Sequence, residues 1–253
     1  MSFYKLIFSP TGGTEKIADI IVKEWTQPVT MIDISKVNDD FSKYSFNSED
    51  VVLIAMPSFG GRLPAVAAER LSIVKGNSAK CVLVCVYGNR AYEDTLAEME
   101  DIAIKCDFKI MAAVSAVAEH SIMRQYATGR PDERDTHTLA DFSKQIVEKL
   151  NLSDINALKI PGNRPYKKAG SAGLIPKADK NCTKCKSCAI ECPVGAIDPT
   201  DVAKTDKNKC ISCMRCVTHC SQNARKANGA LISVAALAIK NACSQRKEPE
   251  LFI

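Results

Sequence analysis

Along the first 150 positions, apolar and polar residues follow two different patterns. Short apolar runs of strand length occur at 3–8, 29–33, 50–56, 81–87 and 108–118. Between them lie longer segments with apolar residues every three or four positions, at 14–25, 65–74, 93–105 and 136–150. Buried strands that alternate with amphipathic helices are typical of a parallel sheet covered on both faces. The pattern predicts an α/β fold with an open, doubly wound, five-stranded parallel sheet.

Ligands of such a sheet bind outside the carboxyl ends of its strands, near the point where the strand order switches. Three loops follow expected strands at that edge, at 9–14, 57–62 and 88–92. We therefore look for the chemistry of the first domain in these loops.

The periodic spacing of apolar residues ends near residue 152. Residues 159–179 are rich in Pro, Gly and Lys and have no period, which is typical of a linker. A cysteine-dense segment follows, and Gly229–Cys243 predicts a short helix. We divide the chain into an α/β domain at 1–152, a linker at 153–178, a cysteine-rich domain at 179–226, and a C-terminal helix and tail at 227–253.

Composition limits the number of domains that the chain can form and the cellular compartment that we expect for it. Apolar residues make up 46% of the 253 positions, enough to bury the core of one large or two ordinary domains. The N-terminal apolar run is too short for a signal peptide, and no run reaches the roughly 18 residues of a membrane span. We expect a cytoplasmic protein, in which the twelve cysteines are metal ligands or inert thiols and not disulfides.

Charge is divided unevenly along the chain. Residues 1–152 carry 17 Lys and Arg against 21 Asp and Glu, a net of −4, and residues 153–253 carry 17 against 8, a net of +9. A basic half can bind nucleic acid, but no ladder of aromatic residues accompanies the lysines. A small domain that holds anionic metal clusters would also be rich in cations. We therefore expect no nucleic-acid partner.

Eight of the cysteines form two copies of one motif, C-x2-C-x2-C-x3-C, placed 28 residues apart. Zinc sites, the main alternative, take four ligands that usually come as two pairs with a longer gap. In the tighter spacing, three thiolates bind one [4Fe–4S] cluster and the fourth binds the other. We expect a first cluster on Cys182, Cys185, Cys188 and Cys220, and a second on Cys210, Cys213, Cys216 and Cys192.

The repeat resembles the bacterial two-cluster ferredoxins over residues 179–226. One departure is that Pro193 follows the last cysteine of the first copy, whereas Ser221 follows that of the second. Proline fixes the backbone there without binding iron, so we expect a change in geometry or potential and not the loss of a cluster. The other four cysteines are expected to be inert buried thiols, namely Cys81, Cys85, Cys106 and Cys243.

The turn SPTGGT at 9–14 joins the first expected strand to the first expected helix. It is neither a Walker A loop nor a dinucleotide fingerprint. Its hydroxyls, its backbone N–H groups and the helix dipole suit a phosphate, and the lack of Lys or Arg in the turn favours a monoester bound by neutral donors. A plain turn with a helix cap is the alternative.

The turn resembles the FMN-phosphate loop of flavodoxins at Ser9, Thr11, Gly12 and Thr14, with Gly13 between them. The resemblance implies a flavin ring between the next two loops, with Phe59 or Tyr92 stacked on it. The remaining ring contacts would be Pro57, Ser58, Gly60, Gly61 and Arg62 in one loop, and Tyr87, Gly88, Asn89 and Arg90 in the other. The whole chain resembles the flavodoxin–ferredoxin fusion proteins of anaerobic bacteria and archaea, which implies a flavodoxin-like FMN-binding domain at 1–152.

Two charged features qualify this resemblance. Flavin loops of flavodoxins are typically acidic, whereas Arg62 and Arg90 flank the expected ring site. A nearby cation stabilises an anionic reduced flavin, so we expect a raised flavin potential, unless both arginines face water. His120 follows the fifth strand and is a candidate proton donor to the flavin or a substrate, with an exposed loop residue as the alternative.

We expect a protein that moves electrons between two [4Fe–4S] clusters and FMN, coupling one-electron and two-electron steps. It could be a carrier between redox partner proteins, a flavin reductase acting on a small molecule, or a redox sensor. A walled cavity built by residues 119–135 and the 160–178 linker would favour the reductase. The linker residues Arg164, Lys167 and Lys168 could dock an acidic partner or cover the flavin, with a solvated tether as the simpler expectation. The sequence is also compatible with a homodimer.

Cofactor content tests this interpretation directly. Protein purified without oxygen should contain about eight irons, with matching sulfide, and one FMN per chain. Quantitation of iron, sulfide and flavin gives the result, and four irons or no flavin would contradict the interpretation.

Overall fold

The computed structural model describes residues 1–37, 39–152, 158–170 and 172–253. Residues 153–157 and 171 of the expected linker therefore lie outside the described residues. No helix of the described part is both long enough and apolar enough to cross a membrane.

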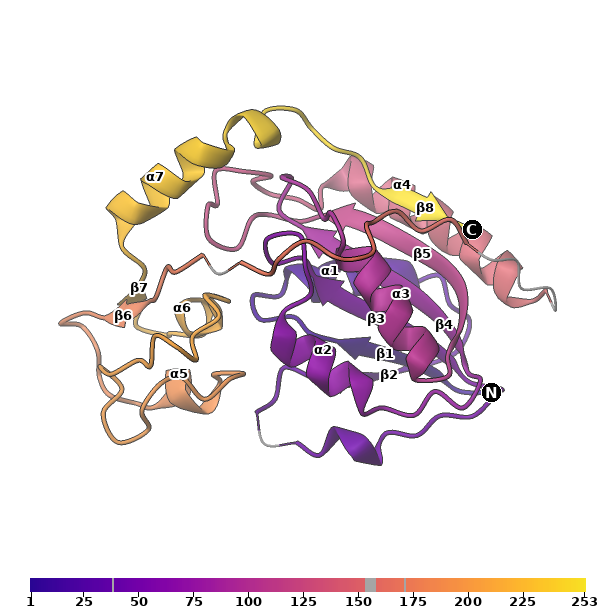
Figure 1. Ribbon diagram of the computed structural model, residues 1–253, viewed down its shortest axis with the longest axis horizontal. Helices are drawn as coiled ribbons and strands as arrows, with labels where there is room; N and C mark the ends of the chain where they lie inside the picture. Colours follow the sequence, from indigo (N-terminus) through magenta and orange to yellow (C-terminus); the bar gives the residue numbers. More distant parts are fainter. Residues whose placement is uncertain (38, 153–157, 171) are drawn as a thin grey trace.

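The first domain is built on one twisted sheet (Figure 1). Its parallel strands are β1 (Phe3–Ile7), β2 (Val29–Asp33), β3 (Val51–Pro57), β4 (Lys80–Tyr87) and β5 (Lys109–Val117). Their order, β2-β1-β3-β4-β5, is the flavodoxin-like order of a doubly wound sheet. The predicted fold class is confirmed, and every expected strand is present within two residues of its expected ends.

Helices cover both faces of the sheet. They are α1 (Gly13–Val22), α2 (Ala65–Ser72), α3 (Thr95–Lys105) and α4 (Glu133–Leu150), with a short 3-10 helix, η1, at Phe41–Lys43. Successive residues of β3 point to opposite faces, so Ile54 packs in the core under α2 and α3 while Leu53 packs in the core under α1 and α4. Because both faces of the central strands are buried, their sequences are continuous apolar runs.

Helix α4 begins three residues earlier than its apolar pattern indicates. The Asp132 carboxylate accepts a hydrogen bond from the backbone N–H of Asp135 at 3.0 Å, and the Asp135 carboxylate accepts one from the N–H of Asp132 at 3.0 Å. This reciprocal capping box satisfies N–H groups that the helix leaves without partners. The capping residues are polar, so the periodicity of apolar residues does not predict them.

The cysteine-rich domain contains two copies of one backbone shape. Each motif leads into a single helical turn, α5 (Ser187–Ile190) or α6 (Arg215–Thr218), and β6 (Lys177–Ala178) pairs antiparallel with β7 (Arg225–Lys226). Residues 28 positions apart share left-handed backbone angles, with φ of 65° at Lys186 and 62° at Met214. The sequence repeat is therefore also a structural repeat. Helix α7 (Gly229–Ile239) and a 3-10 helix, η2 (Asn241–Cys243), follow it.

Part of the linker is fastened to helix α3. The backbone N–H groups of Asn163 and Lys167 donate to the Asp94 carboxylate at 2.8 and 2.7 Å. The Arg164 guanidinium binds Asp101 through two hydrogen bonds from Nε, at 2.9 and 3.0 Å. The expectation of a solvated tether is wrong for this stretch, because Arg164 and Lys167 pair with carboxylates of the α/β domain.

The C-terminal tail returns to the sheet, which the sequence did not predict. Its last strand, β8 (Glu250–Phe252), pairs antiparallel with β5 and lies beside it in Figure 1. The Arg246 guanidinium binds both Asp132 and Asp135 at the start of α4. The Arg130 guanidinium donates to the backbone carbonyl of Lys247 at 2.8 Å. A strand of three residues carries too short a pattern to be predicted from hydrophobic periodicity.

The ion pair between Arg130 and Asp135 should be a main support of this corner. Both side chains are buried, with 6% and 1% of their surface exposed. We expect Asp135→Ala to lower the free energy of unfolding by about 3–5 kcal/mol, because a buried guanidinium loses its anion. Urea unfolding measures the change, and the exposed Asp141→Ala serves as the control that should leave stability almost unchanged. Equal effects of the two substitutions would contradict the assignment.

Candidate iron–sulfur and flavin sites

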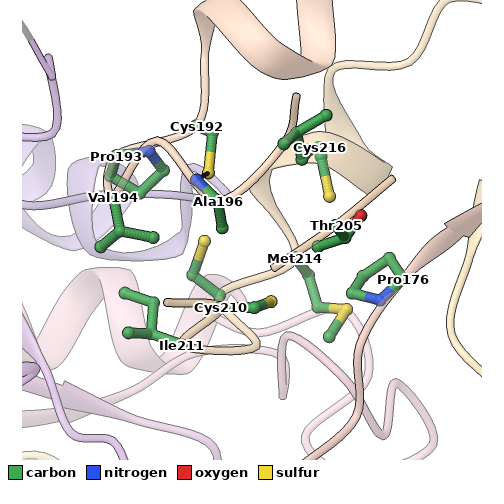
Figure 2. Close-up of a pocket in the computed structure, with 12 residues that line it drawn as sticks. Pro176, Cys192, Pro193, Val194, Ala196, Thr205, Cys210, Ile211, Met214 and Cys216 are labelled. Carbon is green, nitrogen blue, oxygen red and sulfur yellow. Dashed lines mark hydrogen bonds between the residues drawn. The ribbon is translucent and has the colours of Figure 1, made fainter. Parts of the chain in front are cut away.

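Four cysteines of the cysteine-rich domain line one apolar cavity. They are Cys192 from the first copy of the motif and Cys210, Cys213 and Cys216 from the second. Figure 2 shows the sulfur atoms of Cys192, Cys210 and Cys216 directed toward the same space. The rest of the lining is largely apolar and includes Pro193, Val194, Ala196, Ile197, Ile211 and Met214. The structure thus gathers the four residues that the spacing assigns to the second cluster.

Backbone N–H groups donate to equivalent sulfurs in the two copies. The N–H of Ala196 donates to Cys192 Sγ at 3.3 Å, and the N–H of Ala224 donates to Cys220 Sγ at 3.2 Å. A hydrogen bond to a thiolate favours its charged form, which is the form that binds iron. The alanine that lies four residues after the last cysteine of each motif therefore contributes its backbone N–H group and not its side chain.

Burial makes the free thiols of this cavity weak acids. It raises the pKa of Cys213 to about 12 and that of Cys216 to about 11. Thiolates at these positions therefore need positive charge nearby, which bound iron would supply. Among the described residues, no group of three or more His, Cys, Asp or Glu side chains is placed to hold a single metal ion. Ligands of a [4Fe–4S] cluster each bind a different iron and lie farther apart than ligands of one ion.

The other predicted ligand set lies closer to solvent. Cys185 is exposed, and Cys182, Cys188 and Cys220 are half-buried. The hydroxyl of Ser187 interacts with Cys185 Sγ at 3.4 Å, and hydrogen bonding from Ser187 lowers the pKa of that thiol. The two sets therefore differ in environment, one enclosed and one facing water.

The turn at 9–14 has the shape of an anion site but uses one of its hydroxyls internally. Gly12 has a φ of +85°, and α1 begins at the next residue. Ser9 is buried, and its Oγ accepts a hydrogen bond from the N–H of Glu15 at 3.0 Å. Thr14 is also buried, whereas Thr11, Gly12 and Gly13 are half-buried. The backbone N–H groups at the start of α1 are therefore the main donors that the turn can offer.

A cation from the cysteine-rich domain reaches this turn. Arg215 Nη1 lies 3.4 Å from the carbonyl oxygen of Ser9, and the same guanidinium binds Glu191. No local sequence signal predicts this contact, because Arg215 is 206 positions from the turn.

The loop at 57–62 forms a tight turn. The backbone N–H of Phe59 donates to the carbonyl of Arg62 at 2.9 Å, and Gly60 and Gly61 have φ of +63° and +87°. A Cβ on Gly61 would lie 1.7 Å from the Glu93 carboxylate, so this position tolerates only glycine. Phe59 is half-buried, Pro57 ends β3, and Ser58 Oγ accepts a hydrogen bond from Thr95 at 2.7 Å.

The two arginines beside the expected ring site are both paired with carboxylates. Arg62 forms two hydrogen bonds of 2.8 Å to Glu98, and Arg90 Nη2 donates to Glu93 at 2.7 Å. Each side chain is partly enclosed, so neither one simply faces water. Each positive charge is therefore offset locally by a carboxylate, which reduces the effect that these arginines would have on a flavin beside them.

The loop at 87–92 holds the C-terminal tail. Asn89 is buried, and its Nδ2 donates to the carbonyls of Cys243 and Gln245 at 3.0 and 2.9 Å. Tyr92 packs against Tyr87 with ring centroids 5.3 Å apart and donates its hydroxyl hydrogen to Glu250 at 2.8 Å. The side chain of Asn89, the carbonyl of Arg90 and the hydroxyl of Tyr92 are thus engaged by the tail.

His120 lies next to this loop. A Cβ on Gly88 would lie 2.7 Å from the imidazole of His120, so glycine is needed there. His120 Nδ1 accepts hydrogen bonds from the N–H groups of Ile122 and Met123, both at 3.2 Å. Burial lowers the pKa of His120, with the charge of Arg90 acting in the same direction. The imidazole is therefore neutral near pH 7, with its proton on Nε2.

Comparison with known proteins agrees with the division into two parts. Residues 181–225 match the family of 4Fe-4S dicluster domains. The chain joins a flavodoxin-like fold to a 4Fe–4S dicluster domain. Over 44 residues it is 48% identical to one subunit of the ion-translocating oxidoreductase complex of Methanosarcina acetivorans, a match that covers 17% of this chain and 17% of that protein.

Solved flavodoxin structures are similar to the other part of the chain. The flavodoxin of Streptococcus pneumoniae TIGR4 is 20% identical and covers 58% of this chain and 99% of its own, with a TM-score of 0.43. A flavodoxin from the domain Archaea is 12% identical and covers 60% of this chain and 100% of its own, also with a TM-score of 0.43. The assignment of the fold depends on the strand order described above and not on these scores.

The low pKa of His120 predicts a pH dependence of stability. Below about pH 6.5 the unfolded chain takes up a proton on this histidine that the folded protein binds less readily. The unfolded state binds more protons in that range, so stability should fall as the pH drops. The His120→Gln variant should lack this contribution. Its free energy of unfolding, measured with urea, should therefore change less between about pH 7.5 and pH 5.5. An unchanged slope would contradict the buried, neutral histidine.

The lining of the cavity predicts which cluster depends on Cys192. We expect Cys192→Ser to damage the cluster held mainly by the second copy of the motif, and the iron content to fall from about eight to about four per chain. Iron quantitation and electron paramagnetic resonance (EPR) of the reduced protein measure the loss. Cys106→Ala, another buried thiol, is the control that should keep the full iron content. A normal iron content in Cys192→Ser would contradict the ligand set.

Proposed function

We propose that this chain is an electron-transfer iron–sulfur flavoprotein that holds two [4Fe–4S] clusters and one FMN. The observation that carries the proposal is the cavity in which Cys192 joins Cys210, Cys213 and Cys216. Zinc ligands usually come as two pairs, whereas one cysteine of one motif with three of the other is what a two-cluster arrangement requires. The first cluster would then be held by Cys182, Cys185, Cys188 and Cys220.

The contacts between the two domains support electron exchange between them. Arg70 donates to the carbonyl of Pro193 at 2.6 Å, directly after the ligand candidate Cys192. Ile211, between Cys210 and Cys213, packs against the core of the α/β domain. Arg215, between Cys213 and Cys216, contacts the turn at Ser9. The enclosed ligand set therefore lies against the carboxyl edge of the sheet, where we place FMN.

FMN would be held by this chain as follows. The N–H groups at the start of α1, with Thr11 and Gly12, would bind the phosphate, and Arg215 would add a positive charge nearby. The loops at 57–62 and 87–92 would hold the ring, with Phe59 or Tyr92 against it. When bound, FMN supplies two-electron chemistry and the clusters supply one-electron chemistry.

The outer face of the cysteine-rich domain supports a redox partner. Cys185 is exposed, and the lysines around it, Lys180, Lys184 and Lys186, are exposed as well. A partner with an acidic surface would be attracted to this face and would lie close to the first ligand set. The enclosed set would then be the nearer one to the flavin.

One observation favours reduction of a small molecule as a second candidate function. A cavity of about 500 Å³ lies beside the loop at 87–92, within the range of ligand pockets. It is lined by Tyr87, Ala91, Tyr92, Glu93, Lys247, Glu248 and Glu250. Its outer wall is the C-terminal tail, and not residues 119–135 or the linker, from which we expected such a wall.

Rapid mixing with dithionite tests the proposed function. In the loaded protein, the flavin should be reduced after the clusters, at a rate that becomes independent of dithionite concentration because the transfer is intramolecular. In Cys192→Ser the flavin should be reduced more slowly and in proportion to dithionite, while Cys106→Ala should behave like the unmodified protein. Flavin reduction that never depends on the clusters would contradict the proposal. Saturating turnover with a small quinone would support the reductase.

A further inference from the structure

Arg225 breaks the internal repeat of the cysteine-rich domain. It lies 28 positions after Ile197, which occupies the same place in the first copy. Ile197 is buried in a small apolar cluster with 4% of its surface exposed, and Arg225 is buried even more deeply, with 1% exposed. One copy therefore places an apolar side chain where the other places a full positive charge.

The buried charge of Arg225 has no carboxylate partner among the described residues. Its guanidinium donates to the carbonyls of Val202 and Pro176 at 2.7 and 2.9 Å, and to Thr205 Oγ1 at 2.7 Å. All three acceptors are neutral, and Nε is buried without a hydrogen-bond partner. The buried Arg130, by contrast, is paired with Asp135. A buried charge is costly unless an anion compensates it, so an anion is expected beside Arg225.

The side chain of Arg225 lies between the two predicted ligand sets. Its Nη1 is 3.7 Å from Cys188 Sγ, a ligand candidate of the first cluster. Two of its hydrogen-bond acceptors, Pro176 and Thr205, line the cavity of the second ligand set. The missing anions are therefore thiolates of both sets.

We propose that Arg225 is the shared counter-cation of the two clusters and holds both of their reduction potentials above the values they would otherwise have. The inference rests on the proposed two-cluster function. Each reduction brings one electron from the redox partner and no proton, so the charge beside Arg225 becomes more negative by one unit. A fixed cation stabilises that reduced state, and burial keeps its charge from being screened. Arg225 thus acts through the cysteine ligands and does not bind iron.

Redox titration of Arg225→Gln, followed by EPR, tests the proposal. The variant removes the charge but keeps a polar side chain, and both midpoint potentials should shift to more negative values. Lys226→Gln is the matched control, because it removes the same charge from the next residue, which is exposed. Its potentials should shift much less, since water screens the charge it removes. Unchanged potentials in an Arg225→Gln protein with full iron content would overturn the proposal.

Arg225→Lys covers the case in which the glutamine variant fails to assemble its clusters. Lysine keeps the charge but loses the forked hydrogen bonds, so the potentials should stay close to those of the unmodified protein. A large negative shift in a fully loaded lysine variant would show that hydrogen bonding and not charge sets the potentials, and would overturn the proposal. Failure of the unmodified protein itself to contain two clusters would instead contradict the proposed function.

Discussion

Sulfur and positive charge occupy the interior of residues 179–226, where larger domains place apolar side chains. The fully buried members of the apolar cluster there are Ala189, Cys192, Ala196, Ile197 and Val202. So short a segment cannot bury enough surface to be stable by hydrophobic packing alone. Its fold must therefore depend on what the cysteines bind and on its contacts with the α/β domain. The buried guanidinium of Arg225 is part of the same constraint, since only an anionic neighbour offsets its burial.

The α/β domain supports the cysteine-rich domain from several directions. Arg70 and Arg215 connect the two through backbone carbonyls, while Met214 and helix α7 form an apolar contact with Met123. The linker and the tail are each fastened beside the loops that would hold a flavin ring. These contacts place the enclosed cysteines, the turn at 9–14 and the loop at 87–92 near one edge of the sheet.

Much of the first domain could be predicted because its signals are local. Strands such as β3 and β4 are continuous apolar runs, and α4 carries a clear helical period, so packing and pattern agree. The beginning of α4 was missed, since Asp132 and Asp135 are polar. The partner of Arg62 could not be predicted either, because Glu98 is 36 positions away and reaches it only through the packing of α3 against the loop. Long-range ion pairs leave no periodic trace.

The sequence by itself determined the class of the sheet and the presence of two copies of one cysteine motif, because residue spacing specifies both directly. Tertiary structure alone decided that Arg215 meets Ser9, that the tail binds Asn89 and forms β8, and that the linker lies on α3. It also decided that Arg225 is buried, with its guanidinium beside Cys188 and on the carbonyl of Val202. Such contacts join residues far apart along the chain, and their energy depends on burial and charge in three dimensions.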